Sequence, residues 1–187
     1  MPEIAHEEIR MPDWPDIEEF MAFCQESRID GESMKSLLQL WIRWKELLQS
    51  FRITDGKKSW LAVWLPEEVE HEVDQAWALA PSRGFLCNAL AQFLCMSAIN
   101  ERLPAVADAG CAPAPEPALA LKLGLAEAGL EVENDTGLLK RRYAVVTWFP
   151  FRGGCEVCSL RENCPKGSGG SDFASMVLPG HERSGGE

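Results

Sequence analysis

The uncharged stretch at residues 85–99 constrains the fold of this chain more than any other segment. It contains no Asp, Glu, Lys or Arg, so a helix formed here would be apolar around most of its circumference. Such a helix is stable only where other elements surround it on most sides. We therefore predict that residues 85–99 form a helix through the middle of the hydrophobic core.

Four other segments have the spacing of amphipathic helices. The clearest starts at Gly31-Glu32-Ser33 and ends near Ile53, and its apolar residues recur every three or four positions: Met34, Leu37, Leu38, Trp41, Trp44, Leu48 and Phe51. Shorter helices are expected at about 16–27, 66–77 and 117–128. Residues 58–65 are too few to assign to helix or strand, and the Ala- and Pro-rich stretch 105–117 is expected to be a surface loop.

The segment 142–149 has the β-branched and aromatic content of a strand. Turn-forming residues at 134–137 separate it from a shorter stretch of apolar and polar residues, and this arrangement suggests a hairpin. We therefore expect a mainly α fold. It would be one helical domain over residues 14–165, with a small C-terminal β-hairpin and a cysteine-rich metal-binding knuckle at 153–165.

Length and charge limit the functions open to the chain. Its 187 residues suffice for one domain with a core. The net charge of −11 argues against nucleic acid binding, which requires clustered Lys and Arg. No stretch approaches the roughly 18 uncharged apolar residues of a membrane span, and the acidic N-terminus is unlike a secretory signal. We expect a cytoplasmic protein that binds a protein partner and no membrane, with flexible termini at 1–13 and 166–187.

Three of the seven cysteines form a compact motif near the C-terminus. Cys155, Cys158 and Cys164 have the spacing C-x2-C-x5-C, with two glycines before the motif and Pro165 directly after it. Two thiolates two residues apart can turn toward one centre because the backbone between them folds into a tight loop. In a reducing compartment, clustered cysteines favour metal binding over structural disulfides. We predict that these three cysteines are metal ligands.

The residues around the motif favour iron over zinc. A structural zinc site usually has two ligand pairs, or one pair with nearby histidines, and the only histidine downstream is His181. Four-iron cubanes commonly take a compact group of cysteines plus a remote one, often with proline after a ligand. A four-iron cubane, [4Fe–4S], is therefore the preferred cofactor, and zinc is the alternative.

Over about residues 155–165, the motif resembles the iron–sulfur clasp of AddB-type and CRISPR-associated nucleases of the RecB family. In those proteins one upstream cysteine joins a C-terminal C-x2-C-x5-C group. The resemblance implies cluster ligation by Cys155, Cys158 and Cys164. It does not imply nuclease activity, because the carboxylate and lysine motifs of those nucleases have no identifiable counterpart in this chain.

The fourth ligand must then be one of the remaining cysteines: Cys24, Cys87, Cys95 or Cys111. Cys87 and Cys95 are separated by ~12 Å of rise and ~80° of rotation on a straight helix, so they cannot easily serve one cluster together. Free cysteines are also common core residues. We favour Cys87, because it lies near the N-terminal end of its predicted helix, where amides and the helix dipole stabilise an anionic cluster.

The sequence thus favours a small iron–sulfur protein in which the cluster has a structural role or relays electrons. One alternative is a zinc-stabilised module for protein interaction or regulation. A second is an enzyme with an open iron, held by only three thiolates. No phosphate-binding loop, zinc-protease motif or serine-hydrolase motif is present, so an enzymatic role is not favoured.

Overall fold

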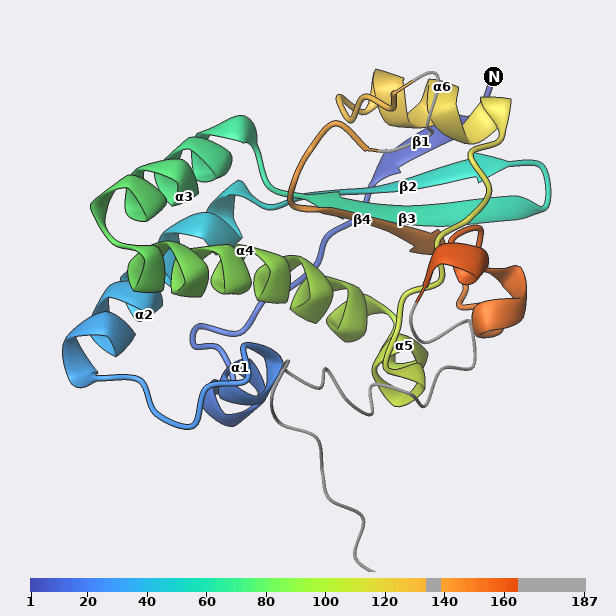
Figure 1. Ribbon diagram of the computed structural model, residues 1–187. Coiled ribbons are helices and arrows are strands. Elements are labelled where there is room, and N and C mark those ends of the chain that lie inside the picture. The colour runs from blue at the N-terminus through green and yellow to red at the C-terminus, as the bar shows by residue number, and fades with distance from the viewer. Residues whose placement is uncertain (134–138, 165–187) are drawn as a thin grey trace, which may run out of the picture.

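The computed structural model describes residues 1–133 and 139–164. Four strands form one antiparallel sheet in the order β1-β2-β3-β4 (Figure 1). Their bounds are Glu3–His6 for β1, Gln49–Asp55 for β2, Lys58–Trp64 for β3 and Ala144–Trp148 for β4. The strands at the two ends of this order, β1 and β4, are the edges of the sheet.

Six helices accompany the sheet in the described part of the chain. They are α1 (Ile17–Phe23), α2 (Gly31–Leu47), α3 (Glu67–Leu79), α4 (Pro81–Arg102), α5 (Pro104–Ala109) and α6 (Leu119–Glu127). Two short 3-10 turns follow β4, namely η1 (Cys155–Val157) and η2 (Arg161–Asn163). Figure 1 shows α6 on one face of the sheet, with α4 and α5 on the other face.

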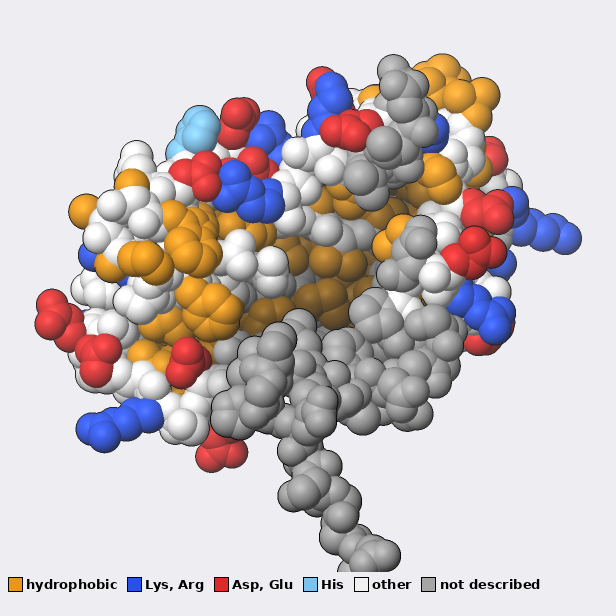
Figure 2. Space-filling model, in the orientation of Figure 1, with side chains coloured by type: hydrophobic (Ala, Val, Ile, Leu, Met, Phe, Trp, Pro, Cys, Tyr) orange, Lys and Arg blue, Asp and Glu red, His pale blue; other side chains and the backbone are white. Residues whose placement is uncertain are grey.

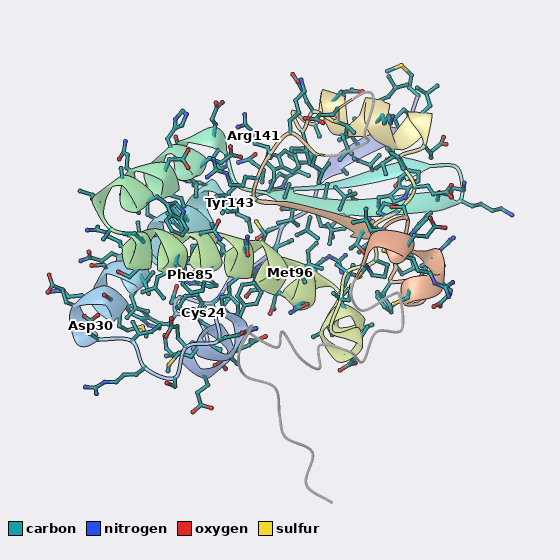
Figure 3. All side chains as sticks on the ribbon, viewed as in Figure 1. Cys24, Asp30, Phe85, Met96, Arg141 and Tyr143 are labelled. Atoms are coloured by element: carbon teal, nitrogen blue, oxygen red, sulfur yellow. The ribbon has the colours of Figure 1, made fainter. Side chains whose placement is uncertain are left out.

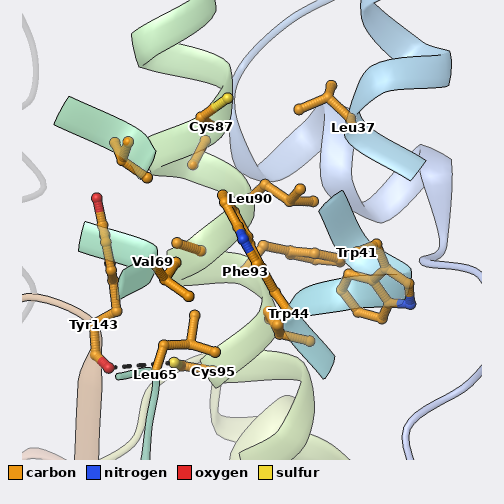
Figure 4. Packing of buried hydrophobic residues seen from close by; sticks show 14 of the residues in the cluster. Leu37, Trp41, Trp44, Leu65, Val69, Cys87, Leu90, Phe93, Cys95 and Tyr143 are labelled. Atoms are coloured by element: carbon orange, nitrogen blue, oxygen red, sulfur yellow. Dashed lines mark hydrogen bonds between the residues drawn. The ribbon is translucent and has the colours of Figure 1, made fainter. Parts of the chain in front are cut away.

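The central helix predicted from the uncharged stretch is confirmed. Helix α4 has ten buried residues, and it packs against α1, α2 and α3 as well as against β3 and β4. Figure 4 shows its Leu90 and Phe93 among the side chains of Trp41 and Trp44 from α2. The apolar circumference of α4 is stable because neighbouring elements cover it on several sides.

The two faces of the sheet have different partners. Trp60, Ala62 and Val146 pack with Leu121 and Leu125 of α6. On the opposite face, Leu61, Val63 and Val145 pack with Ile99 of α4 and Val106 of α5. This alternation along β3 and β4 is the two-residue period of a strand that is buried on both faces.

The fold is mixed α/β and not mainly α as predicted. The helical content was expected, whereas the four-stranded sheet was not. Helix α2 ends at Leu47, and Phe51 and Ile53 belong to strand β2. The strands β2 and β3 form a hairpin because Asp55 and Lys58 pair across a two-residue turn in which Gly56 has a φ of 59°. The apolar residues of β2 continue the spacing of the helix before it, which is why the helix was predicted too long.

The predicted C-terminal hairpin was also wrong in its pairing. Strand β4 forms as expected, but its neighbour is β3, and an isolated bridge between Val132 and Leu139 is the only pairing described where the partner strand was expected. Strand β1 lies inside residues 1–13, which were expected to be flexible. The predicted turn at 134–137 and the tail at 166–187 fall outside the described residues. No helix in the described ranges is long and apolar enough to cross a membrane.

Candidate metal centre

Four cysteines line one small cavity beside the end of β4. They are Cys111, Cys155, Cys158 and Cys164, and the cavity between them has a volume of about 80 Å³. The remaining lining residues are Ala109, Pro113, Gly154 and Arg161. The structure therefore brings together the three cysteines of the C-terminal motif and adds a fourth from the segment between α5 and α6.

The loop between Cys155 and Cys158 is held in a tight turn. The amide of Cys158 donates a hydrogen bond to the carbonyl of Cys155 (3.3 Å), and the amide of Gly154 donates to Glu156 Oε1 (3.0 Å). This backbone hydrogen bond is the main reason why the pKa of Glu156 is below its usual value. The preceding Gly153 has a φ of 46°, and a Cβ built on it would lie 2.3 Å from Glu156 Oε1. Any other residue would be strained at this φ and would displace the Glu156 side chain.

A second short turn places the third cysteine of the motif. The amide of Arg161 donates to the carbonyl of Cys158 (3.2 Å), and the amide of Cys164 donates to the carbonyl of Arg161 (3.3 Å). The chain from Cys155 to Cys164 is thus a succession of tight turns, and each of its three cysteines lines the same cavity.

The fourth cysteine is carried by residues 111–115, which we call the strap. Helix α5 ends at Gly110 in the left-handed conformation, with a φ of 63°, and the strap follows directly. Ser159 donates from its amide to the carbonyl of Ala114 (2.8 Å) and from its hydroxyl to the carbonyl of Pro115 (3.3 Å). The buried hydroxyl of Thr147 donates to the carbonyl of Pro113 (3.0 Å). These bonds fix the strap against both β4 and the cysteine motif.

The site lies at the surface and not in the core. Cys155 is exposed, whereas Cys111, Cys158 and Cys164 are partly covered. No three His, Cys, Asp or Glu side chains in residues 1–133 and 139–164 are grouped closely enough to hold a single metal ion as they stand. The four cysteines line one cavity without forming such a group.

Cys87, the favoured fourth ligand from sequence, lies elsewhere. It is on α4, 5% exposed, in the core cluster formed by α1 to α4 (Figure 4). It precedes the end of α4 by 15 residues, which corresponds to ~22 Å along the helix axis. That end of α4 leads through α5 to the strap (Figure 1), and Cys87 is not among the residues that line the cysteine cavity.

The other two cysteines are also core residues. Cys24 follows α1, and Cys95 lies on α4, where its thiol donates to the carbonyl of Tyr143 (3.6 Å; Figures 3 and 4). Burial raises the pKa of the Cys24 and Cys87 thiols, and it raises the pKa of Cys95 to about 12. Because a metal ligand must be a thiolate, these environments suit structural cysteines better than ligands.

The basic residues before β4 have partners on α3. Arg141 forms ion pairs with Glu67 and Glu70 (Figure 3). Arg142 forms a bidentate ion pair with Asp74, in which the shorter N–O distance is 2.6 Å. The hydrogen bond from Arg142 lowers the pKa of Asp74. Their positive charge is thus balanced within the protein.

Comparison with known proteins gives no relative for this chain: no family model, no curated protein and no solved structure matches it. A function has to be inferred from the side chains themselves. Of the features described above, the cavity lined by four cysteines is the one whose chemistry is most specific.

Proposed function

We propose that this chain is an iron–sulfur protein that holds a [4Fe–4S] cluster through Cys111, Cys155, Cys158 and Cys164. One observation carries the proposal, namely that these four cysteines line a single cavity. Four cysteine thiolates are the usual ligand set of such a cluster. Cys111 thereby replaces Cys87 as the fourth ligand.

The spacing of the cysteines favours a cluster over zinc. A single zinc ion requires its thiolates at about 2.3 Å from one point, and no three candidate ligands in the described ranges stand that close together. In a cubane each thiolate binds a different iron, so the sulfur atoms surround a body of several atoms. We take the cavity that the four cysteines line, without forming a single-ion group, as support for this second arrangement.

The other lining residues fit an anionic cluster. Arg161, a cationic residue, lines the cavity together with the apolar residues Ala109 and Pro113. A cluster with four thiolates has a net negative charge, so a neighbouring guanidinium stabilises it. When bound, the cluster supplies one-electron redox chemistry. The protein residues hold it, restrict its contact with water and set its potential through charge and hydrogen bonding.

Two roles follow from the position of the site, and they are compatible. The ligands come from the segment after α5 and from the segment after β4, so a bound cluster cross-links two parts of the chain and stabilises the fold locally. Cys155 is exposed, so one corner of a bound cluster would lie at the surface, which an electron relay to a protein partner requires. We propose a cytoplasmic location, because reducing conditions keep these thiols available.

The test is metal analysis of the full chain, purified without oxygen and supplied with both iron and zinc. We expect about four iron atoms and four sulfides per chain, and a low-temperature EPR signal after reduction. The variant Cys111→Ser should lose most of the iron, because it removes a ligand. The matched control is Cys87→Ser, a buried cysteine outside the cavity, which should keep its iron.

Other outcomes would decide against the proposal in distinct ways. Stoichiometric zinc without iron would favour the zinc-stabilised module. Full iron in Cys111→Ser together with loss in Cys87→Ser would restore Cys87 as the ligand. Full iron in both variants would favour a cluster with three protein ligands and an open iron, which is the arrangement expected of an enzyme.

A further inference from the structure

Strand β4 is an edge strand of the sheet that the described residues form. The amide of Leu65 donates to the carbonyl of Tyr143, and the amide of Phe149 donates to the carbonyl of Ser59. In an antiparallel pair the hydrogen-bonded positions alternate, so Val145 and Thr147 face β3 whereas Ala144 and Val146 direct their N–H and C=O groups outward. Within residues 1–133 and 139–164, no strand pairs with this outer side.

A groove runs along the same edge. It has a volume of about 720 Å³ and is lined by both Val145 and Val146, whose side chains lie on opposite faces of the sheet. A cavity that touches both faces of one strand must lie beside its edge. Its walls are α6, represented by Leu121 and Leu125, and the cysteine motif, represented by Leu160. Figure 2 shows an apolar hollow in this region, between the α3–α4 side of the molecule and α6.

The groove is of the kind that accepts an extended peptide. Unpaired backbone groups provide hydrogen bonds, and apolar walls on both sides hold alternate side chains. Leu160, at one wall, is 49% exposed although it is a large apolar residue. An apolar segment that added to β4 would cover this side chain and satisfy the outward groups of Ala144 and Val146.

The sequence contains such a segment shortly after the cysteine motif. After Cys164, which is four residues beyond Leu160, the sequence continues for 23 residues. Residues 173–178 read Phe-Ala-Ser-Met-Val-Leu, which is uncharged and apolar apart from one serine, and Pro179 follows. The eight residues before it, 165–172, can span up to ~28 Å when extended. Asp172 immediately precedes the segment, and Lys122 lines the groove.

We propose that residues 173–178 bind along the outer edge of β4 as a fifth strand of the sheet. The segment occupies the groove between α6 and the cysteine motif and covers Leu160. This interaction does not require the cluster, because neither the outward groups of β4 nor residues 173–178 belong to the cysteine site. The tail thereby protects an edge that would otherwise pair with a strand of another protein.

Hydrogen–deuterium exchange on the iron-loaded protein tests the proposal. The full chain is compared with a chain ending at Lys166, and deuterium uptake is measured in a peptide that covers residues 143–149. We expect about two more amides to exchange rapidly in the shortened chain, those of Ala144 and Val146, because an antiparallel strand protects alternate amides. Their exchange should be at least tenfold faster than in the full chain.

Point variants in the tail show whether the sequence of the segment matters. Val177→Asp places a charge within the proposed strand and should give the same fast exchange as the shortened chain. Ser171→Asp adds the same charge outside the segment and should behave as the unchanged protein. Neither substitution alters a residue of the described fold, so an unfolded variant is not expected, and the iron content of each sample verifies this.

Equal exchange of β4 in the full chain, the shortened chain and Val177→Asp would overturn the proposal. Protection that appears only at high protein concentration, together with dimers in light scattering, would also overturn it, because the segment would then bind a second copy. Either result leaves the cluster proposal intact as long as the samples retain iron. Loss of iron with normal protection of β4 would overturn the cluster proposal and leave the strand proposal intact.

Discussion

The hydrogen bond from Thr147 to the strap offers a direct measure of how the protein holds its fourth cysteine. Thr147 is fully buried, and its hydroxyl donates to the buried carbonyl of Pro113 (3.0 Å). Thr147→Val keeps the shape of the side chain but removes the donor, so the carbonyl of Pro113 is left without this partner. An unsatisfied buried group costs about 1–3 kcal/mol. Because Pro113 is two residues from Cys111, we expect the strap to detach more readily.

The assay is urea unfolding together with the rate of iron loss to a chelator. If the whole cost appears as detachment of the strap, the rate of iron loss should rise by roughly 5- to 150-fold, which corresponds to 1–3 kcal/mol. The control is Thr54→Val, whose hydroxyl contacts Ser59 (3.0 Å) at the β2–β3 hairpin, away from the site. Equal rates of iron loss in the two variants would refute the reasoning.

Two further predictions concern Gly153 and the stability of the protein at low pH. Gly153→Ala should lower the iron content, because a side chain is strained at this positive φ and Glu156 would have to move away from the Gly154 amide. Gly31→Ala, with open space around it, should keep the iron, and iron analysis of both variants checks this. The ion pair with Arg142 lowers the pKa of Asp74 from 3.8, so its stabilising effect is present above this value and is lost as the pH falls through the lower folded pKa. Asp74→Asn should therefore reduce the loss of stability below about pH 4, measured by urea unfolding across pH, and an unchanged acid profile would contradict the assignment.

The sequence predicted the elements whose pattern is local and unambiguous. The uncharged stretch identified α4, and the β-branched residues identified β4. The secondary structure of β2 was predicted wrongly. Phe51 and Ile53 continue the helical spacing of α2, although Asp55 and Gly56 are residues typical of a hairpin turn. A short strand that follows a helix directly has too few residues to establish its own period. Its identity is decided by pairing with β3, which is a contact between segments and not a local preference.

The candidate site was predictable only in part for the same reason. Cys155, Cys158 and Cys164 are close in sequence, so their spacing alone indicated a shared site. Cys111 is brought to them by the strap, through hydrogen bonds that Ser159 and Thr147 donate to backbone carbonyls. Such bonds cannot be predicted from a residue pattern, because every residue has a backbone carbonyl that can accept them. The Ala- and Pro-rich loop around Cys111 was the only available signal, and it identified a loop without indicating where that loop packs.

The position of the cysteines in the chain explains why the proposed cluster stabilises one side of the molecule. A link between Cys111 and Cys155 closes a loop of about 45 residues, and the chain-entropy relation gives such a link roughly 4 kcal/mol. This loop contains α6 and β4. The other side is built from α1 to α4 around their own apolar cluster, with no ligand among its residues. A bound cluster would therefore hold the strap and the turns after β4, and the exposed Cys155 would leave one of its corners at the surface. The same position would thus serve both of the proposed roles, the structural one and the electron relay.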